Sequence, residues 1–425
     1  MIDAQGVVTP VFSKSRSKAL RQKRMAALAA KSLSRDMNKP SQLRMISLVQ
    51  LEKACEEYAR KKKHVPVEIQ FLAGLQRIDY VFVDPERRDI IIAGPAEGFA
   101  PDETGRVVGL TTGRPPLRAD DLVVALRALQ QSSTIGCSID PVKERLANMI
   151  RYNNRNSFPA SPNVAGSRFA TLARILGRQN VRVWGVPAHT HFGQTLVEAD
   201  YVMKLVCIGL KRVRVKGFRS YLSMIGAKGN TMQRWWFLPL YDAFHTTEDE
   251  NAFQFAGQRA QLMSQEEKVS ATGNRTDSKT TRKSTTKFAK LFTEKFPELT
   301  TQVPVFAELQ NLMDLAILAA LLKKKRLPEK VGWKMSLFLD PERATVIKGY
   351  APKQVPTVYN YKRLNRRMFV GLINGGVTID PLRTINQIEF RKVTRGPLFA
   401  ARRKIKRDTK SKAPNRWWWD AATRD

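Results

Sequence analysis

Residues 77–94 read RIDYVFVDPERRDIIIAG, and this stretch decides the fold class. Two runs of β-branched and aromatic residues flank Asp84-Pro85, a pair typical of turns, so the stretch predicts a β-hairpin. Before it, ISLVQLEKACEEYARK (46–61) has apolar residues at helical spacing, and after it ADDLVVALRAL (119–129) does the same. The sequence therefore predicts interleaved strands and helices.

The sequence of the hairpin turn is similar to a segment later in the chain. Phe82–Arg87 (FVDPER) is similar to Phe338–Arg343 (FLDPER), and SIDP at 138–141 is similar to TIDP at 378–381, in the same order. This order is compatible with duplication of a small α/β unit, at 70–145 and 332–385. The alternative is convergence, because Asp-Pro suits turns in any protein.

We therefore predict an α/β or α+β protein with two related hairpin-plus-helix units around a mainly helical middle and basic extensions at both ends. The expected segments are a basic arm (1–45), a first α/β unit (46–145), a middle region with the helix VEADYVMK and the segment RWWF (146–267), a Ser/Thr/Lys-rich linker (268–287), a helical segment (288–330), a second α/β unit (331–390) and a basic tail (391–425).

The charge balance is the most unusual property of the composition. The chain has 73 Lys and Arg against 38 Asp and Glu, a formal net charge of +35, while 43% of its residues are hydrophobic. A chain with this many apolar residues can bury a core. The protein as a whole is therefore not a disordered basic polypeptide. A folded body with this surplus repels itself unless an anionic partner is near. A basic proteome, a saline habitat or a basic assembly partner would also account for the charge.

Composition gives little evidence of a cofactor, a membrane span or a redox role. The three cysteines are far apart, so neither a disulfide framework nor a zinc spacing follows. The most apolar stretch, Leu315–Leu322, has roughly half the length that a bilayer crossing needs. The first residues lack a signal-peptide pattern, which predicts a cytoplasmic protein for the chain as given and an exported one if a signal peptide has been removed. No phosphate-binding loop or other cofactor motif is present, and the sequence predicts no cofactor.

Two histidines could bind a metal. His189 and His191 would share a face if they lay on one strand, and Glu198 or Asp200 could supply a third ligand. The alternative, which we favour, is a polar loop, because the pair lacks a cysteine or a further clustered histidine.

Glu198, Asp200 and Lys204 are candidate catalytic residues because they lie in an otherwise apolar helix, where ionisable groups have shifted pKa values. This interpretation predicts a hydrolase-like enzyme. The alternative is a buried structural ion pair between Asp200 and Lys204, which are one helical turn apart, and we favour it.

The basic segment KRVRVK (211–216) is a candidate anion-binding strand. Alternation along a strand would place three cations in one row: Arg212, Arg214 and Lys216. A neighbouring segment could add a cation and a stacking surface through Arg234, Trp235 and Trp236. In the alternative interpretation the tryptophans belong to the core and the cations to a solvated strand face.

Several blocks resemble the planctomycete family of domain of unknown function 1598. They include FLAGLQRIDYVFVDPERRDIIIAGPAEGF (71–99), GCSIDP (136–141), VRVWGVPAHTHFGQTLVEADYVMK (181–204), RWWFLPLYD (234–242) and INGGVTIDP (373–381). The resemblance extends over about residues 70–385 and implies no activity, because the family has none established. It marks the VEADYVMK helix and the RWWF segment as family blocks, while His189 departs from the family pattern. Its members resemble exported proteins with signal sequences, which this chain lacks.

From these observations we expect a non-enzymatic binding or assembly protein that docks an anionic partner, either nucleic acid or an acidic envelope polymer, through a basic face. The competing hypothesis is the enzyme described above.

Overall fold

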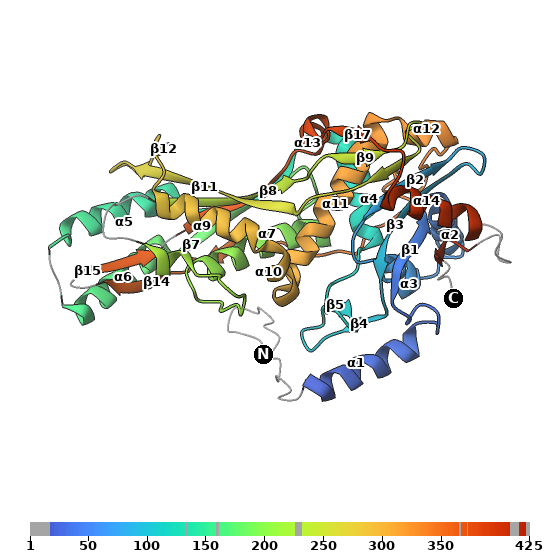
Figure 1. The fold of residues 1–425 in the computed structure, drawn as a ribbon. Coiled ribbons are helices and arrows are strands. Elements are labelled where there is room, and N and C mark those ends of the chain that lie inside the picture. The colour runs from blue at the N-terminus through green and yellow to red at the C-terminus, as the bar shows by residue number, and fades with distance from the viewer. Residues whose placement is uncertain are drawn as a thin grey trace.

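The computed structural model describes residues 18–132, 134–158, 161–225, 232–364, 367–371, 373–408 and 416–421. Within them the chain forms two seven-stranded sheets, two small two-stranded sheets and 14 α-helices, so the mixed α/β class is confirmed. Figure 1 shows the two large sheets in different halves of an elongated molecule, with helix α11 between them.

The first sheet contains the predicted hairpin. Its strand order is β17 (Phe390–Lys392), β9 (Phe244–Thr246), β10 (Ala252–Gln254), β2 (Tyr80–Asp84), β3 (Asp89–Ala96), β1 (Ser41–Ser47) and β18 (Trp418–Asp420). Strands β2 and β3 pair antiparallel with Asp84 opposite Asp89, as the turn chemistry predicts. Only β17 and β9 pair in parallel among the described strands of this sheet.

The second sheet carries most of the candidate site residues. Its order is β12 (Arg275–Asp277), β11 (Arg259–Val269), β8 (Met232–Leu240), β16 (Ile373–Ile379), β6 (Ile135–Asp140), β7 (Arg178–Trp184) and β13 (Gln354–Pro356). Strands β16 and β8 pair in parallel. The small sheets pair β14 (Asn360–Leu364) with β15 (Arg367–Gly371), and β4 (Phe99–Pro101) with β5 (Val107–Gly109).

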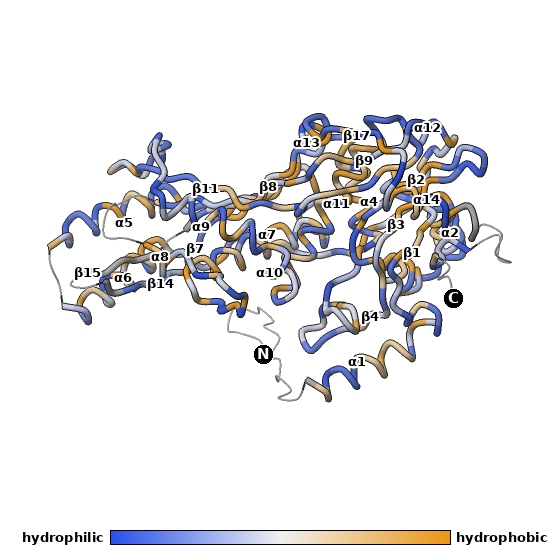
Figure 2. Tube along the Cα trace, in the orientation of Figure 1, coloured by the Kyte–Doolittle hydropathy of each residue, from blue (hydrophilic) through white to orange (hydrophobic). Residues whose placement is uncertain are grey.

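The helices are α1 (Lys18–Ser32), α2 (Leu48–Arg60), α3 (Val67–Gln70), α4 (Ala119–Gln131), α5 (Lys143–Arg155), α6 (Pro162–Leu176), α7 (His191–Cys207), α8 (Tyr221–Met224), α9 (Lys283–Glu294), α10 (Phe296–Gln302), α11 (Pro304–Lys324), α12 (Leu327–Val331), α13 (Pro381–Gln387) and α14 (Pro397–Asp408). Helix α11 is long and apolar enough to cross a membrane, but 94% of its apolar window is buried inside the protein. Such burial is that of a core helix, and Figure 2 shows hydrophobic residues along α11, α4 and β1–β3.

The two echoed segments are not copies of one structure. Phe82–Arg87 closes the hairpin β2–β3, whereas Phe338–Arg343 lies in turns outside the strands, beside the buried carboxylate of Glu52. In the second pair, β6 ends at Asp140 and β16 ends just before Asp380, and a helix begins within three residues of each aspartate. This pattern agrees with convergence on a common turn, and the duplication stays a prediction without structural support.

Residues 268–287, predicted to be a Ser/Thr/Lys-rich linker, contain β12 and the first turn of α9. Thr285 is fully buried, and its hydroxyl donates a hydrogen bond of 2.7 Å to Glu266. Arg282 donates to the same carboxylate oxygen at 2.8 Å. The Ser/Thr-rich composition here supplies donors to a buried carboxylate, which composition alone does not reveal.

Part of the predicted basic tail completes the first sheet. Strand β18 pairs with β1, and the buried Arg44 donates to both carboxylate oxygens of Asp420, at 2.8 and 3.0 Å. Helix α14 packs on the same sheet through Leu398, Ala401 and Ile405. In the predicted arm, β1 already begins at Ser41; residues 1–17 of the arm and 409–415 and 422–425 of the tail lie outside the described residues.

Candidate functional site

Helix α7 holds the predicted catalytic residues, but it divides them between two faces. The helix begins at His191, after Thr190 caps it by accepting a hydrogen bond from the Gly193 N–H at 3.1 Å. Glu198 lies two turns from His191 on the face towards α4 and α11. Asp200 and Lys204 lie on the face against the second sheet, so the three predicted residues do not form one site.

Asp200 and Lys204 form a closed ion pair. Their side chains are 0% and 2% exposed, and the Lys204 Nζ lies 3.0 Å from the Asp200 Oδ2. Burial raises the pKa of Asp200 to about 6, against the opposing effect of the Lys204 charge. Because neither group reaches solvent, the geometry favours a structural pair over acid/base catalysis.

The other face of α7 contributes to a cluster of polar side chains, which we call the α7 polar cluster. Its members are Arg106, Asp121, His191, Glu198 and Glu308. Arg106 donates to Glu198 at 2.6 Å and also to Glu308. The His191 Nδ1 lies 2.8 Å from Asp121, and its Nε2 lies 3.8 Å from Glu308. The cluster therefore links the β4–β5 turn, α4, α7 and α11.

The electrostatics of the α7 polar cluster favour a protonated histidine. Burial lowers the pKa of His191, but the charge and hydrogen bond of Asp121, helped by Glu308, raise it to about 9. An imidazolium cannot act as a general base at neutral pH. The Thr195 hydroxyl lies 3.4 Å from the His191 Nε2, but Thr195 is only 1% exposed, so it cannot meet a substrate as a nucleophile.

The two candidate metal-binding histidines do not share a strand. His189 is exposed in the turn before α7, and His191 begins the helix, so the two do not lie on one strand. Among the described residues, no group of three or more His, Cys, Asp or Glu side chains is placed to hold a metal ion.

The basic segment 211–216 is exposed but is not a strand. Arg212, Arg214 and Lys216 are exposed and Val215 is buried, so cations and valines do alternate between solvent and core. The backbone of Arg214 bonds to the side chain of Gln302, with its N–H donating at 2.6 Å and its carbonyl accepting at 2.7 Å. A glutamine amide therefore takes the place of a strand partner.

The RWWF segment places its tryptophans on opposite faces of β8. Trp235 is fully buried and contacts Phe288 of α9 with ring centroids 5.0 Å apart. Trp235 therefore cannot stack on a ligand. Trp236 is partly exposed on the other face, where the Arg234 guanidinium lies 5.3 Å from its ring centroid. Arg234 and Trp236 thus lie on the face of the sheet turned away from α9.

A groove lined by cations lies beside α9 and was not predicted from the sequence. We call it the α9 groove. It has a volume of about 670 Å³ and four cations in its lining: Arg219, Lys283, Lys287 and Lys290. The lysines recur at i, i+4 and i+7 along α9, and this spacing in KSTTKFAK was a detectable signal. It was missed because Lys283 and Lys287 were assigned to the linker and Lys290 to the helical segment that follows.

Comparison with known protein families finds a match for one region of the chain. The family described as protein of unknown function (DUF1598) matches residues 137–221. The matched range contains α7 and the basic segment 211–216, and it ends before α9. Neither a curated protein nor a solved structure matches the chain. Over residues 137–221 the chain is therefore similar to the DUF1598 family, whose description assigns no function.

Proposed function

We propose that this protein is a non-enzymatic binding or assembly protein that docks an anionic polymer, nucleic acid or an acidic envelope polymer, through the α9 groove. The observation that carries the proposal is that three lysines of α9 and Arg219 line one hollow of the surface. None of these four side chains forms an ion pair with another described residue, and Glu294 is the only carboxylate that lines the groove.

Unpaired cations held this close repel one another, and an anionic ligand relieves that repulsion. Lysines provide point charges without a fixed hydrogen-bonding geometry, which suits a repeating anionic backbone more than one particular small ligand. Such contacts position a polymer and do not read its sequence.

The predicted cations of the preceding segment extend this surface. Lys216 directly precedes Gly217, which lines the groove, and Arg212 and Arg214 are exposed along the same stretch of chain. Since Val213 and Val215 turn inward, the segment presents its charges to solvent in succession. We infer that a polymer bound in the groove continues along residues 212–216.

The enzyme hypothesis has less support. Its residues are divided between a closed ion pair and the α7 polar cluster, where the carboxylates already accept hydrogen bonds from Arg106 and face a charged histidine. A hydrolase needs a carboxylate or a base that can reach a substrate. The more exposed member, Glu198, bonds to Arg106.

The test is a salt titration of binding. Fluorescence anisotropy would follow a labelled DNA duplex, a single-stranded RNA and an acidic polysaccharide from about 50 to about 300 mM salt, where log affinity should fall with a slope of about −0.9 per phosphate neutralised on duplex DNA. The triple variant Lys283→Gln, Lys287→Gln and Lys290→Gln should weaken binding of at least one polymer and make the slope on duplex DNA shallower by up to about 2.7.

A matched control removes the same charge elsewhere. Lys61, Lys62 and Lys63 are exposed at the end of α2, in the half of the molecule that holds the first sheet. Their triple glutamine variant should keep most of the affinity. Equal losses in both variants, or binding insensitive to salt, would contradict the proposal.

A further inference from the structure

The second sheet has a face that its helices leave open. Helices α7, α9 and α11 pack on the face that holds Trp235, and Figure 1 shows α7, α9 and α10 on one side of β8 and β11. Strand register defines one row across the opposite face: Met263, Trp236, Gly376, Ser138 and Arg182. The four side chains of this row are partly or fully exposed in the described part of the chain.

Trp184 forms a flat aromatic surface on this face. It lies two residues along β7 from Arg182, and so on the same side of the sheet, and it pairs with Gly136 of β6. A Cβ atom on Gly136 would lie 2.5 Å from the Cζ2 of Trp184, so the indole lies directly over the glycine. One side of the ring is seated on the backbone, and Trp184 is partly exposed.

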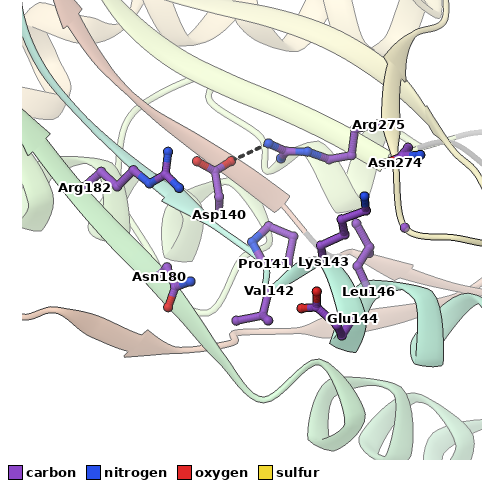
Figure 3. A pocket seen from close by; sticks show the side chains of 11 residues that line it. Asp140, Pro141, Val142, Lys143, Glu144, Leu146, Asn180, Arg182, Asn274 and Arg275 are labelled. Carbon is purple, nitrogen blue, oxygen red and sulfur yellow. Dashed lines mark hydrogen bonds and ion pairs between the residues drawn. The ribbon is translucent and has the colours of Figure 1, made fainter.

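A cavity of about 440 Å³ is lined by Arg182, two residues along β7 from Trp184. Its lining includes Arg182 and Asn180 of β7, Asp140 at the end of β6, Lys143 at the start of α5, and Arg275 of β12. Figure 3 shows Arg182 and Asp140 pointing towards one another, while Arg275 bonds to Asp140 at 2.8 Å. Neither Arg182 nor Lys143 forms an ion pair with another described residue, so both remain available to an anion.

The mixture of charges indicates the chemistry of the ligand. Asp140 and Glu144 also line the cavity, and carboxylates accept hydrogen bonds from hydroxyl groups. An unpaired arginine binds a carboxylate through two parallel hydrogen bonds. A flat indole stacks on an apolar ring face. A ring that carries hydroxyl groups and one carboxylate satisfies all three features, and a uronic acid has this chemistry.

We propose that Trp184, Arg182 and the cavity that Arg182 lines bind an acidic oligosaccharide built of uronic-acid units. The indole stacks on one pyranose ring, Arg182 pairs with the carboxylate of a unit, and Asp140 and Asn180 bond to hydroxyl groups. This site lies on the opposite face of the second sheet from α9, so the inference stands or falls independently of the α9 groove.

The test is isothermal titration calorimetry with a galacturonic-acid hexasaccharide on the full chain. Trp184→Ala and Arg182→Gln should each weaken binding about ten-fold. Arg182→Gln should leave the weaker binding of a neutral glucose hexasaccharide unchanged, because that ligand has no carboxylate for the arginine. The exposed Arg182 can be replaced without loss of packing, so this variant remains informative if Trp184→Ala unfolds.

Lys290→Gln, in the α9 groove, is the matched control and should bind the hexasaccharide as the unmodified chain does. Three results would overturn the proposal: absence of hexasaccharide binding, binding unaffected by Arg182→Gln, or displacement of the hexasaccharide by a thymidine oligonucleotide whose own affinity depends on Trp184. The last result would assign the face to single-stranded nucleic acid, which also stacks on aromatic rings.

Discussion

Loss of the His191 charge should destabilise the protein over a defined pH range. The folded-state pKa of about 9 lies above the ordinary value of 6.5, so the folded protein binds the histidine proton more tightly than the unfolded chain. The stabilisation is therefore fully present below pH 6.5 and is lost as the pH rises towards 9. At about 1.4 kcal/mol per pKa unit, the shift corresponds to a loss of about 3 kcal/mol in the free energy of unfolding.

Urea unfolding at several pH values from 6 to about 9.5 would measure this loss. The difference in unfolding free energy between the unmodified chain and His191→Gln should shrink steadily with rising pH, since both end with an uncharged side chain. Asp121→Asn should move the same trend to lower pH, because the carboxylate that raises the pKa is gone.

His64 supplies the control, because it is exposed and forms no ion pair with another described residue. His64→Gln should show no comparable trend. The reasoning is refuted if the difference between the unmodified chain and His191→Gln is constant over this range, because the imidazolium would then contribute nothing through Asp121 and Glu308. Asp89 and Asp200, with pKa values of about 6, titrate at the lower end of this range, but both are present in the two variants and cancel in the difference.

Two further predictions concern buried charges. Asp200→Asn and Lys204→Met should each cost about 3–5 kcal/mol of stability in urea unfolding, because each leaves its partner buried without an opposite charge. The double variant should lose much less than the sum, and strictly additive losses would argue against a coupled pair. Asp420→Ala should cost about 3 kcal/mol, because it removes the carboxylate that pairs with the buried Arg44 and anchors β18, and a loss below about 1 kcal/mol would show that the strand is held otherwise.

The parts of the fold that sequence predicted are those set by local chemistry. The hairpin at 77–94 follows from two β-branched runs around Asp84-Pro85, and the helix that contains VEADYVMK follows from its apolar residues. The buried hydrogen bond from Thr285 to Glu266 was not predicted, because neither spacing nor composition relates these two residues. Strand β18 was missed because its partner β1 lies more than 370 residues away.

The candidate site was only partly predictable for the same reason. His191, Thr195 and Glu198 recur at i, i+4 and i+7, so helical spacing alone places them on one face of α7. Their partners Asp121 and Glu308 come from α4 and α11, and no pattern in the sequence pairs them with His191. For the two tryptophans, the alternation of side chains along a strand predicts that Trp235 and Trp236 lie on opposite faces. Which of them is buried depends on the packing of α9, which the sequence does not show.

In the described part of the chain, more acidic than basic side chains are buried, which increases the excess of positive charge at the surface. Several carboxylates are buried acceptors: Glu52 accepts from the backbone N–H groups of residues 337 and 338, Glu97 from those of 111 and 112, and Asp314 from that of 78. These acids hold loops together and are withdrawn from the surface. The exposed cations of the α9 groove therefore face solvent with few carboxylates beside them, which strengthens their field and its sensitivity to salt. Mixed-charge surfaces such as the cavity lined by Arg182 differ in this respect, because Asp140 and Glu144 remain there. The same chain thus presents one surface suited to a repeating polyanion and another suited to a ligand that brings both hydroxyl groups and charge.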